Sequence, residues 1–204
     1  MKLSYNSPII LTLALVSAVV LAFDSFLFTG LVANFFTTPT AFTPYSPTDY
    51  FRFVSYVFGH ANWAHLSGNF LLILLVGPSV EERYGSGRLL FMILATTVAS
   101  AAAMFFFFHY HALGASGIAF MLIILNSFTG KTSDAGKVLV PITFLLVFSL
   151  YFGSELMSSL QTDNTSHFGH LAGGAFGALF GFFMRPERGG LRHIGGSTRT
   201  LTNK

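Results

Sequence analysis

The stretch GASGIAFMLIILNSF, residues 114–128, places a serine at the start of a long apolar run, and HLAGGAFGALFGFFM, residues 170–184, does the same with a histidine. The next charged residue after Ser116 is Lys131, 15 positions downstream, and the next after His170 is Arg185, also 15 positions downstream. A helix rises 1.5 Å per residue, so each polar group is expected roughly 22 Å above its charged end. That level is about 8–10 Å below the far surface of a hydrocarbon core. Polar groups at this depth are costly, and their common level predicts a functional site.

The composition of this 204-residue chain is that of an integral membrane protein. Hydrophobic residues make up 52% of it and charged residues only 9%, whereas soluble domains carry about 25% charged residues. The net charge of +3 arises from lysines and arginines scattered between apolar segments. Such cations are typical topology signals, so membrane lipids are expected as partners and nucleic acid is not. The absence of cysteine excludes disulfides, thiolate metal sites and a cysteine nucleophile.

Six apolar segments predict an all-α bundle of six transmembrane helices. They cover about Ile9–Phe28, Trp63–Val80, Leu89–Phe108, Ser116–Phe128, Val138–Met157 and Phe168–Met184, with Pro78 and Pro141 near helix ends. Residues 30–62, rich in proline and aromatic residues, predict a long interfacial loop with short helices in the headgroup region. Residues 1–184 are thus expected to form one helical domain. The basic tail, residues 185–204, is expected to be disordered and to contact anionic lipid.

The distribution of cations predicts the orientation. An N-terminus in the cytoplasm places 10 of the 11 lysines and arginines on that side and leaves only Arg52 outside. This arrangement satisfies the positive-inside rule and predicts a multi-pass cell-membrane protein with both termini cytoplasmic. The outer ends of the second, fourth and sixth segments then carry His65, Ser116 and His170.

The polar residues at this level favour nucleophilic catalysis. Serine is a weak nucleophile that needs an adjacent base, and His170 is expected to supply it. The absence of Asp and Glu from the sixth segment favours a Ser–His dyad over a triad. His65 and Asn69, four residues apart on one helix face, are expected to stabilise the oxyanion together with the backbone N–H of Ser116.

Alternatives remain for several polar residues. His167 lies three residues before His170 and competes with it as the base. For His60, at the loop junction, a structural hydrogen bond explains the residue at least as well as a catalytic role does. His109 and His111 are expected to lie in a wet loop. A metal site is not expected, because no His-Glu-x-x-His pattern and no membrane-buried carboxylate accompany the histidines. The Glu81-Glu82-Arg83 run is interpreted as a cytoplasmic charge cluster.

Glycines surround both candidate catalytic residues. Gly114 and Gly117 flank Ser116 and are expected to allow backbone or substrate to approach closely. Gly173 and Gly177 form a small-xxx-small face, which predicts tight packing of the sixth helix on the fourth. Such packing is needed to bring an imidazole within hydrogen-bonding reach of a hydroxyl.

These motifs resemble those of the rhomboid family of intramembrane serine proteases. The resemblance covers roughly Phe51–Met184 and rests on the family order of three patterns. They are His60-x4-His65-x3-Asn69, Gly114-Ala115-Ser116-Gly117 and His170-Leu171-Ala172-Gly173-x3-Gly177, and the stretch Val80–Gly87 is also similar to the turn that follows the second helix in the family.

The resemblance implies Ser116 as nucleophile, His170 as base, and His65 with Asn69 as oxyanion stabilisers, without a cofactor. It also implies a membrane-embedded first loop and a minimal six-helix prokaryotic form. In the family a tyrosine often stacks on the catalytic histidine one turn after the serine, and here that position is Phe120. The ring contact is expected to survive this change, whereas the phenol hydroxyl is lost.

The expected activity is endopeptidase cleavage of transmembrane protein substrates near the outer membrane boundary. The alternative within the family is a catalytically inactive relative that binds membrane clients. A small-solute transporter is disfavoured, because the only acidic residues near the spans' outer ends are Asp24 and Glu155, and they suggest no paired intramembrane charges.

Overall fold

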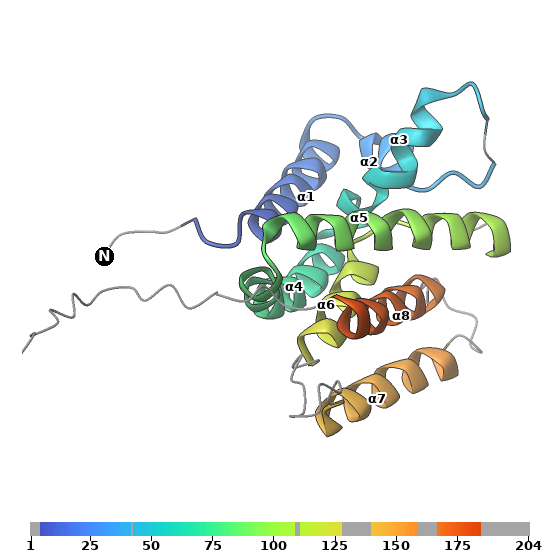
Figure 1. The fold of residues 1–204 in the computed structure, drawn as a ribbon. Helices are drawn as coiled ribbons and strands as arrows, with labels where there is room; N and C mark the ends of the chain where they lie inside the picture. Colours follow the sequence, from blue (N-terminus) through green and yellow to red (C-terminus); the bar gives the residue numbers. More distant parts are fainter. Residues whose placement is uncertain (1–4, 42, 109–110, 128–139, 159–166, 185–204) are drawn as a thin grey trace, which may run out of the picture.

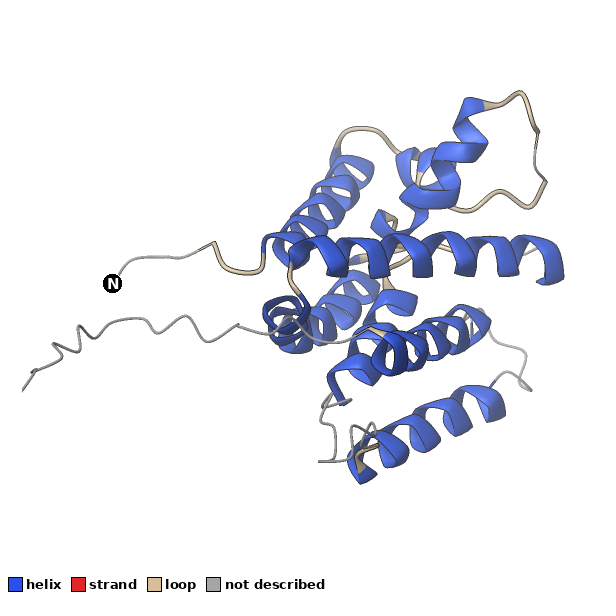
Figure 2. Ribbon diagram, viewed as in Figure 1, coloured by secondary structure: helices blue, strands red, loops and turns tan. Residues whose placement is uncertain are grey.

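The computed structural model describes residues 5–41, 43–108, 111–127, 140–158 and 167–184, and this part of the chain contains helices and connecting segments without a strand (Figure 2). The helices are α1 (Pro8–Phe26), α2 (Leu31–Phe35), α3 (Pro47–Ser55), the 3-10 turn η1 (Tyr56–Phe58), α4 (Trp63–Tyr84), α5 (Ser86–Ala103) with a π-helical turn at Met104–Phe108, α6 (Ser116–Ser127), α7 (Ile142–Ser158) and α8 (His167–Phe183). The fold is all-helical, as the sequence predicts.

Three of these helices are long and apolar enough to cross a membrane: α1, α4 and α5 continued to Phe106. Their outward faces carry large apolar side chains, such as Leu15 at 57% exposure, Leu75 at 73% and Phe91 at 58%. Contiguous exposed apolar surface of this kind is rare on soluble monomers. The protein is therefore a membrane protein whose helices expose these faces to lipid.

Helix α6 is the central helix of the bundle. Figure 1 shows α1, α2 and α3 on one side of α5, and α8 followed by α7 on the other. The most extensive contact is that of α6 with α8, and α4 packs on α6 as well. Along α6, Ile118, Met121, Leu122 and Leu125 are each at most 1% exposed. Ser116 thus begins a helix that is enclosed by its neighbours.

Most helix ends lie close to the expected positions. Helices α1 and α8 agree within two residues, and α5 begins three residues earlier than predicted. Helix α7 begins at Ile142, directly after Pro141, while residues 138–139 lie outside the described part, as does the tail 185–204. Three short helical elements, α2, α3 and η1, lie within the insert of residues 30–62.

The predicted end of the second segment at Val80 is wrong. Helix α4 continues to Tyr84, which places Pro78 inside the helix and makes most of the expected turn helical. Gly85, at a φ of 81°, ends the helix, and its N–H donates to the carbonyl of Glu81 at 2.8 Å. Proline weakens a helix by removing one N–H, but tertiary contacts of the following turn hold it in place.

Glu81, interpreted from the sequence as part of a cytoplasmic charge cluster, has a buried structural role. Its side chain is 3% exposed, and its carboxylate accepts hydrogen bonds from the N–H groups of Ile9 and Ile10, both at 3.1 Å. The hydroxyl of Ser86 donates to the same carboxylate at 2.7 Å. Glu81 therefore caps the N-terminus of α1, whose own N-cap residue, Ser7, makes no side-chain cap.

Candidate active site

Ser116 occupies the first turn of α6. Gly114, two residues earlier, adopts a φ of 111°, a left-handed conformation that glycine tolerates best. The N–H of Ala119 donates to the carbonyl of Ala115 at 2.9 Å, so the helical hydrogen bonds begin there. The N–H of Ser116 is among those that an α-helix leaves without an intrahelical acceptor at its N-terminus.

Glycines bring the backbones of α6 and α8 into contact next to Ser116. A Cβ added at Gly173 would lie 2.0 Å from the carbonyl oxygen of Gly117, and one added at Gly117 would lie 3.2 Å from the carbonyl oxygen of Gly169. One turn further, a Cβ at Gly177 would lie 2.6 Å from the carbonyl oxygen of Met121. The two helices therefore approach more closely than larger residues permit. The turn of α8 that carries His170 lies against the turn of α6 that begins at Ser116.

The ring of His170 is stacked on that of Phe120. Their centroids are 4.5 Å apart and their planes differ by 9°. Phe120 lies four residues after Ser116, so the two side chains share one face of α6. The stacking therefore places the imidazole over the face of α6 that also carries the hydroxyl.

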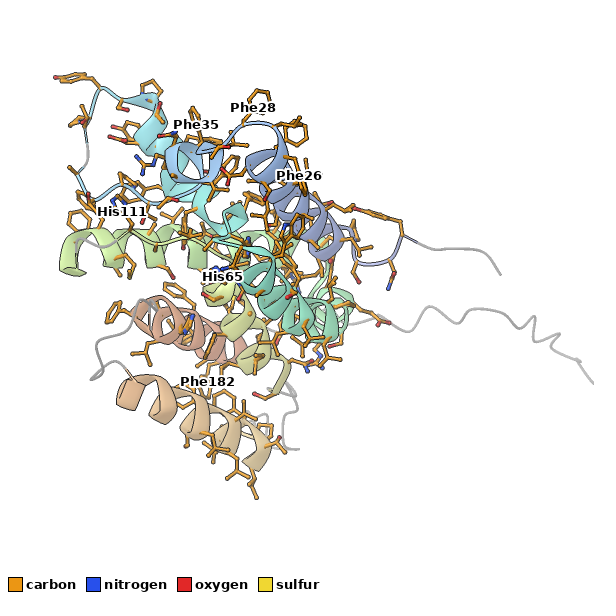
Figure 3. The ribbon with its side chains drawn as sticks, turned by 180° about the vertical axis from the view of Figure 1, so that it is seen from behind. Phe26, Phe28, Phe35, His65, His111 and Phe182 are labelled. Atoms are coloured by element: carbon orange, nitrogen blue, oxygen red, sulfur yellow. The ribbon has the colours of Figure 1, made fainter. Side chains whose placement is uncertain are left out.

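His65 lies in the first turn of α4, near the centre of the molecule (Figure 3). Asn62 caps this helix, and its side-chain oxygen accepts the N–H of His65 at 2.8 Å. The Nδ1 of His65 accepts the N–H of Ala61 at 3.5 Å. Because Nδ1 acts as an acceptor, the neutral ring carries its hydrogen on Nε2. His65 thus presents Nε2 as a hydrogen-bond donor.

Asn69 is oriented by His60. The side-chain nitrogen of Asn69 donates to Nε2 of His60 at 3.1 Å, and Nδ1 of His60 pairs with the carbonyl of Phe58 at 3.3 Å. The His60 ring is 1% exposed and packs edge-on against that of His65, with centroids 5.0 Å apart. His60 is therefore part of the structural support of both neighbours, which is one of the two roles that the sequence left open.

The donors of His65 and Asn69 meet at Gly114. A Cβ added at Gly114 would lie 2.9 Å from Nε2 of His65 and 3.3 Å from the side-chain nitrogen of Asn69. The lack of a side chain at this position lets the backbone before Ser116 approach both groups. The donors of His65 and Asn69 on α4 therefore lie beside the backbone two residues before Ser116, where α6 begins.

Other predicted residues fall outside this group. His111 is exposed, yet its Nδ1 pairs with the carbonyl of Thr38 at 2.9 Å. His167 is the first residue of α8, but its side chain lies outside the described part, as does all of His109. Among the described residues, no three histidine or acidic side chains gather as a possible metal site.

Sequence reasoning missed several supporting residues. The cap from Asn62 to His65 is a local pattern, an asparagine directly before an apolar run, and was available from the sequence. The contacts of Thr38 with Ala112, and of Tyr56 with Gly114, join segments far apart in the chain. No local pattern predicts such contacts.

Burial of His60, and the neighbouring ring of His65, lower the pKa of His60 to about 4. The folded protein then binds this proton more weakly than the unfolded chain, so this contribution to stability is complete above about pH 6.5 and is lost as the pH falls. Acidification from pH 7 to 5 is expected to cost about 2 kcal/mol through His60 alone. The free energies of unfolding of wild type and His60→Gln should be measured in detergent at pH 7 and at pH 5. Acidification should cost wild type about 2 kcal/mol more than it costs the variant. An equal loss in both proteins would contradict the lowered pKa of His60.

Comparison with known proteins places this arrangement in a family. The Rhomboid domain matches residues 47–187. The chain is 31% identical to "Rhomboid protease GluP" of Bacillus subtilis (strain 168) over 133 residues, 64% of this chain and 26% of that protein. It is 30% identical over 154 residues to "Rhomboid-related protein 1" of Caenorhabditis elegans, covering 70% of this chain and 42% of the relative. It is 25% identical over 150 residues to "Rhomboid-like protein 11, chloroplastic" of Arabidopsis thaliana, covering 72% and 49%.

The chain spans between about a quarter and a half of the length of these relatives. The domain match nevertheless includes η1, the four helices α4, α5, α6 and α8 that surround Ser116, and α7. It covers more than half of the chain, and the chain belongs to the rhomboid family.

Proposed function

We propose that this protein is an intramembrane serine endopeptidase with a dyad of Ser116 and His170. The observation that carries the proposal is the meeting of three helices. The start of α6 lies beside the donors of His65 and Asn69 on α4, and the face of α6 that bears Ser116 is covered by the ring of His170 from α8. Similarity to a relative that is named a protease supports the same activity.

The proposed reaction is acyl transfer. His170 removes the proton from the Ser116 hydroxyl as its oxygen attacks the scissile carbonyl, and it then returns the proton to the leaving amine. The N–H groups of His65, Asn69 and Ser116 donate to the oxygen on which negative charge develops. Water enters, and the same histidine assists hydrolysis of the acyl-enzyme.

The proposed topology has six crossings, by α1, α4, α5, α6, α7 and α8, within one domain of residues 1–184. Arg52 donates to the carbonyls of Thr37 and Thr38 in the insert, and Thr38 is bonded to Ala112, four residues before Ser116. Arg83 lies at the other end of α6, where it bonds to Asn126. These two cations therefore lie on opposite sides of the bundle, which supports cytoplasmic termini and a cell-membrane location.

The insert of residues 30–62 is proposed to lie in the outer interface of the membrane. Figure 3 shows Phe26, Phe28 and Phe35 at one end of α1 and over α2. They are 76%, 61% and 44% exposed, and Tyr45 and Phe51 of the insert are exposed as well. Aromatic side chains favour this region of a bilayer. Substrates would be transmembrane proteins cleaved near this boundary, where local unwinding frees their carbonyls.

The test is cleavage of a purified single-pass substrate by the protein in proteoliposomes. Ser116→Ala and His170→Ala are each expected to lower the rate by about 10³-fold or more, because a serine without its base is a poor nucleophile. A fluorophosphonate is expected to label Ser116 in wild type and not in His170→Ala.

Ser67→Ala is the matched control for these variants. Ser67 is exposed on α4, and its hydroxyl donates only to the carbonyl of Ala64 in its own helix, so cleavage should match wild type. Cleavage by Ser116→Ala at the wild-type rate would exclude the proposal. Equal, stable binding of uncleaved substrate by wild type and Ser116→Ala, without labelling, would support the alternative of an inactive client-binding relative.

A further inference from the structure

The segment before the nucleophile is hydrogen-bonded to the insert of residues 30–62. The N–H of Thr38 donates to the carbonyl of Ala112 at 2.9 Å, and the N–H of Ala112 donates to the hydroxyl oxygen of Thr38 at 2.7 Å. The carbonyl of Thr38 pairs with Nδ1 of His111 at 2.9 Å. Thr38 is 2% exposed. One buried residue of the insert thus bonds with two consecutive residues of residues 111–114, here called the nucleophile segment.

The other end of the nucleophile segment is held by the same insert. The N–H of Gly114 donates to the carbonyl of Tyr56 at 2.9 Å, and the hydroxyl of Tyr56 donates to the carbonyl of Thr97 on α5 at 3.1 Å. Ser116 follows two residues later. The position of Gly114 relative to His65 and Asn69 is therefore fixed by the hydrogen bonds that Thr38 and Tyr56 make with the nucleophile segment.

The backbone of the insert around Thr38 is itself held by hydrogen bonds from Arg52. The guanidinium of Arg52 donates to the carbonyl of Thr37 at 2.6 Å and to that of Thr38 at 3.4 Å. Hydrogen bonds from a cation are stronger than neutral ones. Thr38 is consequently a fixed point from which the nucleophile segment is held.

We propose that Thr38 is a positioning residue for the reaction at Ser116, an inference that rests on the proposed function. Its hydroxyl accepts the N–H of Ala112, and this bond keeps Gly114 close to the donors of His65 and Asn69. Without the hydroxyl, a buried N–H loses its acceptor and the segment shifts to regain one. A displacement of about 1 Å at a reacting group costs up to roughly 100-fold in rate.

The test compares Thr38→Val, which removes the acceptor at nearly constant volume, with Thr38→Ser, which keeps it. Thr38→Val is expected to lower kcat about 10- to 100-fold with KM within about twofold, because substrate binding is untouched while the transition state is misaligned. Thr38→Ser should restore most of kcat. Fluorophosphonate labelling of Ser116 should slow in parallel.

Thr37→Val is the matched control. Thr37 is the adjacent buried threonine, and its hydroxyl bonds within the insert, so its loss should affect stability without lowering kcat. Amide hydrogen exchange of residues 111–116 gives a readout that does not depend on activity. We expect exchange there to rise at least about tenfold in Thr38→Val and to stay unchanged in Thr37→Val.

The outcomes separate the two proposals. A wild-type kcat in Thr38→Val, in a preparation where Ser116→Ala is inactive, would overturn the role of Thr38 and leave the proposed function standing. Absence of cleavage and labelling in wild type would overturn the proposed function. In that case the exchange comparison still decides whether Thr38 holds the nucleophile segment, and unchanged exchange would overturn the inference.

Discussion

Replacing Gly173 with alanine is expected to force α8 away from α6 and to lower the rate of substrate cleavage by about 100-fold. The added Cβ would lie 2.0 Å from the carbonyl oxygen of Gly117, whereas carbon and oxygen atoms normally approach to about 3.3 Å. Both partners of this contact are backbone, so no flexible side chain can move aside. The helices must part by roughly 1 Å, and His170, three residues before Gly173, moves with α8. Overpacking should also cost about 1–3 kcal/mol of stability.

Gly174→Ala provides the control on the neighbouring residue. A Cβ at Gly174 would meet only Cγ1 of Ile124 at 3.9 Å, which is an ordinary van der Waals distance. Alanine favours a helix over glycine by about 1 kcal/mol, so stability should be equal or higher and cleavage close to wild type. The measurements are kcat/KM in proteoliposomes and the unfolding midpoint in detergent. Similar behaviour of the two variants would show that the backbone contact at Gly173 is unimportant.

Replacing Glu81 with alanine is expected to lower the free energy of unfolding by about 3 kcal/mol, because hydrogen bonds to a charged group contribute about 1.5–3 kcal/mol each. The carboxylate receives two N–H groups from α1 and one hydroxyl from Ser86. Its loss leaves the buried N–H of Ile10 without an acceptor. Glu81→Gln keeps one acceptor oxygen and should lose about half as much.

Glu82→Ala is the control for the Glu81 variants. Glu82 follows Glu81 on α4 but is exposed, so its removal should change stability by no more than about 0.5 kcal/mol. Denaturation in mixed micelles, followed by helix content, gives the free energies. Protease cleavage of the chain around α1 should rise in Glu81→Ala, because the N-terminus of this helix loses its cap. Equal stability of Glu81→Ala and Glu82→Ala would contradict the capping role.

The sequence predicted the course of the helices well where hydropathy determines them. Helix α1 lies within two residues of its predicted bounds, because a run of apolar residues bounded by polar ones must be helical in lipid. The end of α4 was predicted four residues too early, at Val80, and Pro78 lies inside the helix rather than near its end. The contact of Glu81 with the start of α1 joins residues 71 and 72 positions apart, and no periodicity contains it.

For the candidate site, too, part of the arrangement was predicted from local sequence and part depended on contacts between distant segments. Counting residues at 1.5 Å per step put Ser116 and His170 at one level, and the spacing of His65 and Asn69 put them on one face. The orientation of the Asn69 amide came only from the structure, because it depends on His60 in a loop. The support of the nucleophile segment by Thr38 depends on a residue 74 positions away.

Local sequence was sufficient to predict helices in the described part of the chain, its long apolar segments, and how far along its helix each polar residue lies. Hydropathy, helical rise and turn residues are local properties, and they are read directly from the order of amino acids. Packing of the folded chain sets which helix faces meet, how closely glycines let α6 approach α8, and which buried group accepts a hydrogen bond from the N–H groups at the start of a helix. Those outcomes depend on packing and hydrogen bonds between distant segments, whose partners are defined only once the whole chain has folded.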